Sequence, residues 1–195
     1  MTLDGTDFVF RGKTYHLPLL GAHQVRNAVT VLTLFETLRE TGRWSVPVAA
    51  MQQGLSRVHF PARLEIMGTQ PTVLLDGAHN PSGIESLCAA VRQYLPGGPR
   101  IAVIGMLRDK DYETAVRPLA GMFSRILTLT PASPRALPAE ELAGVLRKFG
   151  GRATACGAPR EAIREACAMA GRDGAVVICG SLYLASDARK LLASR

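Results

Sequence analysis

The sequence predicts an α/β protein, most of which folds as a doubly wound, mostly parallel, Rossmann-like sheet. From residue 61 onward, short apolar runs typical of buried strands alternate with segments in which apolar residues recur at helical spacing. Such alternation favours parallel strands joined by crossover helices, with helices on both faces of the sheet. At 195 residues, of which 47% are hydrophobic, the chain is also long enough to bury a core of this kind.

The first sixty residues follow a different pattern, in which a short hairpin precedes two helices. The runs Phe8–Phe10 and Thr14–Leu17 predict the hairpin, because the turn between them contains a glycine. Apolar residues at helical spacing predict a helix over Ala22–Glu40, with Gly42 after its end, and a second helix is expected over about Val46–Leu55. These elements bury little core by themselves, so they either pack against the larger part or belong to a domain that begins upstream.

Around residues 56–63 the periodic pattern lapses, and Pro61 holds Phe60 extended, which predicts a linker. Beyond it, strands are expected over Leu64–Met67, Thr72–Leu75, Arg100–Ile104, Arg125–Leu129, Ala153–Ala155 and Ala175–Cys179. Helices are expected over Gly83–Tyr94, Asp111–Gly121, Ala139–Phe149, Arg160–Ala170 and Leu182–Ala193. We therefore expect two parts, residues 1–60 and residues 61–195.

The most informative stretch is DGAHNP, residues 76–81, which directly follows the apolar run Thr72–Leu75. It places an acid, an imidazole and an amide at the carboxyl end of a strand, which is where open α/β sheets bind ligands. Ser82 and Glu85 form a capping-box pattern, which predicts that a helix begins here with its N–H groups facing the loop, an arrangement that favours anions. An ordinary turn between a strand and a helix is the alternative.

Composition limits the classes of function. Lys and Arg exceed Asp and Glu by 23 − 16 = 7, but the basic residues are scattered with few aromatics among them. We therefore expect a solvated surface or a small anionic ligand, and no nucleic acid. The four cysteines form no C-x-x-C pair, and we interpret them as reduced core residues. With neither an apolar run of about 20 residues nor a signal peptide, a cytoplasmic protein without a membrane span is expected.

Five strings occur in order along the chain: LGAHQVRNA at residues 20–28, PARLE at 61–65, LDGAHNP at 75–81, GMLRDKD at 105–111 and GSLYL at 180–184. Together they resemble the C-terminal part of folylpolyglutamate synthase/dihydrofolate synthase, a member of the Mur ligase superfamily. The resemblance covers nearly the whole chain. It implies that residues 1–60 are the tail of a central ATP-binding domain and that residues 61–195 are a C-terminal domain of the Mur ligase type.

The resemblance also implies a chemistry, namely ATP-dependent amide bond formation in folate biosynthesis. In this family a carboxylate of dihydropteroate or of a folate takes the terminal phosphate of ATP, with Mg²⁺ offsetting the charge, and L-glutamate then attacks the acyl phosphate. The family's phosphate-binding loop and magnesium ligands lie in an N-terminal domain, and this chain contains no G-x-x-x-x-G-K-[ST] string. We therefore expect the main ATP and Mg²⁺ sites in that missing domain, and a monomeric chain that is inactive alone. The alternative is a stand-alone, non-catalytic α/β module that binds a nucleotide or a protein.

Three residues match positions at which the family contacts the nucleotide. Asn27 matches an asparagine on the first long helix, Arg63 matches an arginine that reaches ATP, and Asp76 matches an aspartate that can accept hydrogen bonds from ribose hydroxyls. Arginine suits phosphate because it stays charged and binds in two-pronged fashion. A polar surface helix explains Asn27 as well, and a surface ion pair explains Arg63.

Three further residues match the region where the family binds glutamate. His79 matches the catalytic histidine beside the reacting phosphate and the incoming glutamate, where it acts as a neutral base or as a cation. Lys110 and Ser181 are expected to help bind glutamate, although Lys110 equally suits an ion pair at a helix start and Ser181 a helix cap. The chain departs from the family at Ala62, where glycine is frequent, and alanine is tolerable there unless φ must be positive. No metal ligand is expected in this chain.

Overall fold

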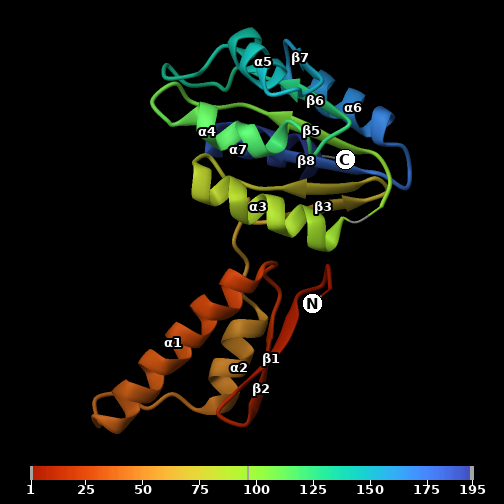
Figure 1. The fold of residues 1–195 in the computed structure, drawn as a ribbon. Coiled ribbons are helices and arrows are strands. Elements are labelled where there is room, and N and C mark those ends of the chain that lie inside the picture. Colours follow the sequence, from red (N-terminus) through yellow and green to blue (C-terminus); the bar gives the residue numbers. More distant parts are fainter. Residues whose placement is uncertain (1, 96, 194–195) are drawn as a thin grey trace. The chain divides into compact units, whose positions relative to one another are not determined.

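The computed structural model of the protein describes residues 2–95 and 97–193, and Figure 1 draws it as a ribbon. The chain forms two compact units that divide between Pro61 and Ala62. The elements of the first unit are the antiparallel strands β1 (Thr6–Phe10) and β2 (Lys13–Leu17), followed by α1 (Ala22–Glu40) and α2 (Val48–Ser56).

A small core holds the first unit together. The Phe8 and Tyr15 rings stack across the hairpin with their centroids 5.7 Å apart, and Tyr15 lies buried with Leu32 of α1 and Met51 of α2. The helix α1 spans the predicted residues. The helix α2 begins two residues later than predicted, because Pro47 has a ψ of 143°, which is outside the helical range.

The second unit is a six-stranded sheet with the order β3-β4-β8-β5-β6-β7, in which β3 runs antiparallel to β4 and the other neighbours are parallel. Its strands are β3 (Glu65–Thr69), β4 (Thr72–Leu75), β5 (Arg100–Ile104), β6 (Arg125–Thr128), β7 (Ala153–Ala155) and β8 (Ala175–Cys179). Its helices are α3 (Pro81–Tyr94), α4 (Tyr112–Val116), the 3-10 turn η1 (Arg117–Leu119), α5 (Ala139–Lys148), α6 (Pro159–Ala170) and α7 (Leu182–Ala193). The prediction of a mostly parallel sheet is confirmed, with β3 as an antiparallel edge.

Helices cover both faces of this sheet, as the doubly wound class requires. Alternate strand residues, among them Val73, Ile101 and Val176, pack with α6 and α7 in one apolar cluster. The intervening residues point to the other face, where the Thr128 hydroxyl donates to the Ala139 carbonyl oxygen of α5 at 2.8 Å. The helices α3 and α4, which contact each other, lie in front of the strands in Figure 1.

The helix α3 begins earlier than its capping-box pattern predicts. Its N-cap is Asn80, whose Oδ1 accepts a hydrogen bond from the Gly83 N–H at 2.8 Å, so the prediction of a cap at Ser82 and a helix from Gly83 is wrong. Asn80 takes this place because Pro81 fixes a helical φ at the first position, where no N–H partner is needed.

The helix predicted over residues 111–121 is also shorter than expected. The α-helical part ends at Val116, and the chain continues as the 3-10 turn η1. Pro118 explains this difference, because it lacks the N–H that would extend the α-helical hydrogen-bond ladder.

The order of the strands decides which loops meet. The strands β4, β8 and β5 are neighbours, so the loops that follow their carboxyl ends come together at one edge of the sheet. These loops are residues 76–80, 180–181 and 105–111. The loop after β6, residues 129–138, joins them because the Arg108 N–H donates to the Arg135 carbonyl oxygen at 2.8 Å.

Candidate functional site

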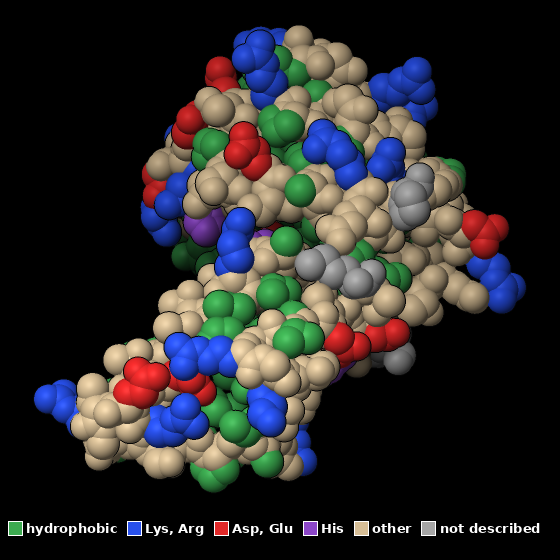
Figure 2. Space-filling model, turned by 60° about the horizontal axis from the view of Figure 1, so that its bottom comes forward, with side chains coloured by type: hydrophobic (Ala, Val, Ile, Leu, Met, Phe, Trp, Pro, Cys, Tyr) green, Lys and Arg blue, Asp and Glu red, His purple; other side chains and the backbone are tan. Residues whose placement is uncertain are grey.

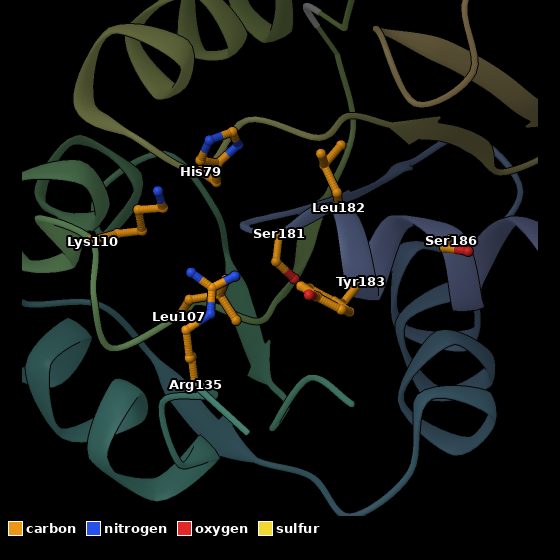
Figure 3. Close-up of a pocket in the computed structure, with 8 residues that line it drawn as sticks. All are labelled: His79, Leu107, Lys110, Arg135, Ser181, Leu182, Tyr183 and Ser186. Atoms are coloured by element: carbon orange, nitrogen blue, oxygen red, sulfur yellow. The ribbon is translucent and has the colours of Figure 1, made fainter. Parts of the chain in front are cut away.

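A pocket of about 410 Å³ opens at this carboxyl edge of the sheet. Its lining residues come from the four loops just described and from the first turns of α7 (Figure 3). They are His79, Leu107, Lys110, Arg135, Ser181, Leu182, Tyr183 and Ser186. The predicted residues His79, Lys110 and Ser181, which lie far apart in the sequence, therefore meet at one pocket.

The orientation of His79 is set by a backbone contact. Its Nδ1 lies 2.8 Å from the Gly77 carbonyl oxygen, which can only accept a hydrogen bond. Nδ1 therefore carries a proton, and in the neutral ring Nε2 is the atom that can accept one. His79 lies at the N-terminus of α3, directly before the N-cap residue Asn80. This arrangement suits a general base, because the basic nitrogen is opposite the one that anchors the ring.

Two basic side chains give the pocket its charge. Figure 3 shows Lys110 and Arg135 around the same opening as His79. A hydrogen bond with Tyr183, followed by the charge of Asp109, raises the pKa of the Arg135 guanidinium. Among the described residues, those that line the pocket include no carboxylate. Arg135 Nη1 pairs with Asp109 Oδ2 at 2.5 Å, outside the lining, so part of its charge is already balanced. With Lys110 beside this pair, the pocket is suited to an anion.

Ser181 has a structural contact within the pocket. Its side chain is buried, and Oγ accepts a hydrogen bond from the Leu184 N–H at 3.1 Å, so Ser181 caps the start of α7. A hydroxyl also carries one donor hydrogen, and this cap does not use it. The helix cap that the sequence suggested is therefore present, and a contact with glutamate stays a prediction.

Asp76 directly follows β4, outside the pocket lining, and organises the loop that carries His79. Its carboxylate is buried, with Oδ2 accepting from the Leu64 N–H and Oδ1 from the Ala78 N–H, each at 2.8 Å. Burial raises the pKa of Asp76, while these two N–H groups and the charges of Arg63 and His79 act to lower it. Both carboxylate oxygens thus have a structural use that sequence analysis did not predict.

Arg63 is exposed and lies in a short segment with unusual backbone geometry. Its neighbours Ala62 and Leu64 have positive φ values, 55° and 47°. Alanine at position 62 is therefore unfavourable, because its φ is positive, and it costs about 1 to 2 kcal/mol relative to glycine. A cost of this size persists only where surrounding contacts hold the backbone in place.

Asn27 belongs to the first unit, on the second turn of α1. Its Nδ2 donates to Gln24 Oε1 at 3.2 Å, and the Gln24 amide nitrogen lies 3.1 Å from His23 Nε2. Gln24 is buried and Asn27 is exposed. The buried amide therefore fixes the orientation of the Asn27 amide at the surface of this unit.

Arg135 and Tyr183 were not singled out by sequence analysis. Tyr183 lies within the string GSLYL, in which only Ser181 received a role. Arg135 follows the carboxyl end of β6, so the rule that led to the loop after β4 could have found it. No motif was recognised in the loop after β6, and its folding back onto the loop after β5 has no local sequence signal.

The described residues do not supply a metal site. Within residues 2–95 and 97–193, no three His, Cys, Asp or Glu side chains gather closely enough to hold an ion. No step of the reaction proposed for this chain depends on Mg²⁺. No described helix is both long and apolar enough to cross a membrane.

Lys and Arg side chains are spread over the face seen in Figure 2, with Asp and Glu among them.

Comparisons with known proteins agree on one family. A family model described as "Mur ligase, glutamate ligase domain" matches residues 62–182. The folylpolyglutamate synthase of Lacticaseibacillus casei is 36% identical over 180 residues, which are 90% of this chain and 40% of that protein. The structure of Mycobacterium tuberculosis folylpolyglutamate synthase complexed with ADP and AMPPCP has a TM-score of 0.80 and 32% identity, covering 92% of this chain and 42% of that one.

A third likeness comes from Escherichia coli. The structure of E. coli FolC in complex with DHPP and ADP has a TM-score of 0.81 at 27% identity, covering 100% of this chain and 45% of that one. The chain thus spans less than half the length of these relatives.

Proposed function

The chain belongs to the Mur ligase family through its glutamate ligase domain, and we propose that it serves as the C-terminal part of an ATP-dependent ligase. That ligase adds L-glutamate to a folate, to dihydropteroate or to both. The observation that carries the proposal is the pocket in which Lys110 and Arg135 accompany His79. In the same proposal, the first unit is the tail of a central ATP-binding domain.

An acidic amino acid such as glutamate suits this pocket. At neutral pH it carries two carboxylates, and Lys110 and Arg135 supply two cationic partners for them. Ser181 adds its hydroxyl hydrogen, since its oxygen already accepts from the backbone of α7. Because each of these charge-assisted contacts needs a carboxylate, glutamine and other neutral side chains are disfavoured.

His79 prepares the amine of glutamate for attack. An ammonium group cannot act as a nucleophile, so a proton must leave before the C–N bond forms. Nε2 is the acceptor for this proton, because Nδ1 already carries one and donates it to the Gly77 carbonyl. The amine then attacks the carbonyl carbon of the acyl phosphate, the C–O bond to phosphate breaks, and phosphate leaves.

The nucleotide is contacted by residues outside the pocket. Arg63 pairs with phosphate, Asn27 contacts the nucleotide from α1, and Asp76 accepts from ribose hydroxyls with the lone pairs that its two backbone contacts leave. The ADP and AMPPCP in the M. tuberculosis structure and the ADP in E. coli FolC support nucleotide binding for this family. The main phosphate and Mg²⁺ contacts belong, in this proposal, to the part of the relatives that this chain does not span.

We predict that the purified chain alone releases no phosphate from ATP in the presence of L-glutamate and either dihydropteroate or a reduced folate. The reason is that the chain carries no phosphate-binding loop. A phosphate-release assay that compares the chain with a complete ligase of the family tests this. Sustained turnover by the chain alone would contradict the division of labour proposed here.

We also predict that L-glutamate binds weakly to the isolated chain at the pocket. In two-dimensional NMR, amide signals of residues 105–111 and 180–184 should shift on titration with L-glutamate. Replacing Lys110 or Arg135 by methionine should raise the apparent Kd about tenfold, because each change removes one charge-assisted contact.

The control variant for this titration is Lys148→Met, at the end of α5 and outside the pocket lining. It removes the same charge and should leave the titration unchanged. L-Glutamine, which lacks the second carboxylate, should bind more weakly than L-glutamate. Equal effects of the three methionine variants would show that the shifts report only the overall charge, and the glutamate assignment would fail.

A further inference from the structure

The segment from Ala62 to Glu65 holds Arg63 between two backbone positions that side chains normally avoid. The positive φ values of Ala62 and Leu64 flank Arg63 on both sides. An L-residue in this region costs about 1 to 2 kcal/mol, so two of them in one short segment are stable only if several contacts enforce them.

Three hydrogen bonds enforce this geometry. The Ala62 N–H donates to Glu65 Oε2 at 2.8 Å, and the Ala62 carbonyl oxygen accepts from the Gly77 N–H at 2.7 Å. On the other side of Arg63, the Leu64 N–H donates to Asp76 Oδ2 at 2.8 Å. Both neighbours of Arg63 are therefore attached to fixed acceptors or donors of the second unit.

Glu65 is in turn held from a distant part of the chain. Its carboxylate side chain is 11% exposed and accepts from Arg189 Nε on α7, at 3.1 Å to Oε1 and 3.2 Å to Oε2. The Glu65 carboxylate thus joins α7, the last helix of the second unit, to the Ala62 backbone, directly before Arg63. A mostly buried carboxylate that bridges two groups in this way is costly to disturb, because each partner would lose its acceptor.

We propose that Glu65, anchored by Arg189, is a positioning residue that fixes the backbone of Arg63 for contact with nucleotide phosphate. A long arginine side chain loses rotamer freedom when it binds, and a fixed backbone reduces the part of the chain that must still be ordered. Glu65 itself touches no nucleotide in this proposal. The ligand of Arg63 rests on the proposed function, whereas the backbone geometry does not.

The first arm of the test measures the backbone without any ligand. In Glu65→Gln, one acceptor oxygen must serve both the Ala62 N–H and Arg189, so the strong intraresidue amide–Hα NOE expected for positive φ should weaken at Ala62. Leu64, whose N–H is held by Asp76, should keep its NOE. Glu85→Gln, an exposed glutamate on α3, makes the same charge change and should leave both signals unchanged.

The second arm measures ADP binding to the chain by NMR titration, well below the unfolding temperature of each variant. Arg63→Met should raise the Kd about tenfold, and Glu65→Gln should raise it by a similar factor, as expected for one lost charge-assisted contact. Ala62→Gly in the Glu65→Gln background should restore the Kd to within about threefold, because glycine adopts the positive φ without an anchor.

Arg189→Met provides a second route to the same state, since it removes the anchor and leaves Glu65 in place. It should weaken the Ala62 NOE and ADP binding in the same direction as Glu65→Gln. This variant also keeps the test informative if Glu65→Gln folds poorly.

The outcomes separate two failures. If Arg63→Met leaves the Kd for ADP unchanged, the nucleotide role of Arg63 in the proposed function is wrong. If Arg63→Met weakens binding but Glu65→Gln and Arg189→Met behave like Glu85→Gln, the positioning role is overturned. A loss of binding in Glu65→Gln that glycine at position 62 does not repair would also overturn it, because the loss would then not act through the backbone.

Discussion

Replacing Asp76 by alanine is expected to lower the free energy of unfolding by about 3 kcal/mol, whether or not a nucleotide is present. The change leaves the Leu64 and Ala78 N–H groups without their acceptors, and both hydrogen bonds are buried. Urea unfolding followed by circular dichroism measures this loss. Asp173→Ala, an exposed aspartate before β8, should change the free energy by no more than about 0.5 kcal/mol.

The pH dependence of Asp76 gives this prediction a second readout. Because burial raises the pKa of Asp76 above 3.8, the folded state holds the proton more firmly than the unfolded state does. The stabilisation from this difference is fully present when the pH is below the pKa of Asp76 in the unfolded chain. It is lost as the pH rises through the higher pKa of Asp76 in the folded state. The advantage of the wild type over Asp76→Asn should therefore shrink from pH 4 to pH 7. An advantage that grows over this range would mean that the backbone contacts outweigh burial.

This result bears on how Asp76 is assigned to the nucleotide. A loss of nucleotide binding in Asp76→Ala would follow from the disturbed backbone alone, since Asp76 holds the N–H groups of Leu64, next to Arg63, and of Ala78, next to His79. Only a loss of binding larger than that of a variant with equal destabilisation supports a direct contact. The resemblance to the family suggested the contact, and the structure adds a competing structural reason for the same residue type.

The fold was largely predictable because its signal is local. The apolar runs of β4, β5 and β8 are buried on both faces of the sheet, and their strand limits match the predicted ones. The strand expected over Leu64–Met67 is observed as β3 (Glu65–Thr69), and two other errors, at Asn80 and Pro118, occur where a cap or a proline decides a boundary. At these positions one side chain outweighs the periodic pattern, which carries no information about it.

The pocket was predictable only in part, for a physical reason. His79, Lys110 and Ser181 follow strands whose carboxyl ends share an edge, so topology alone brings them together. Arg135 enters through a loop that folds back onto another loop. The contact of Glu65 with Arg189 joins residues 124 positions apart, and neither position has a local pattern that would indicate it.

Substituting alanine for Gly180 is expected to be the most destabilising single change at the site, by about 4 kcal/mol. Gly180 has a φ of 106°, and an added Cβ would lie 2.7 Å from the Gly105 carbonyl oxygen and 3.0 Å from Ile104 Cγ2. The backbone carbonyl cannot move away, because β5 and β8 pair directly before it. Chemical denaturation should show the loss.

The Gly180→Ala substitution should distort the pocket as well as destabilise the fold. Gly180 directly precedes Ser181, so any shift that relieves the clash displaces the start of α7 and with it the serine and tyrosine that line the pocket. In the glutamate titration, Gly180→Ala should bind more weakly even at temperatures where it is folded. Gly144→Ala is the matched control, since that glycine lies within α5 with open space around it, and it should stabilise the protein by about 0.8 kcal/mol. If Gly180→Ala is as stable as the wild type and binds glutamate equally well, the close approach of β5 and β8 does not shape the pocket.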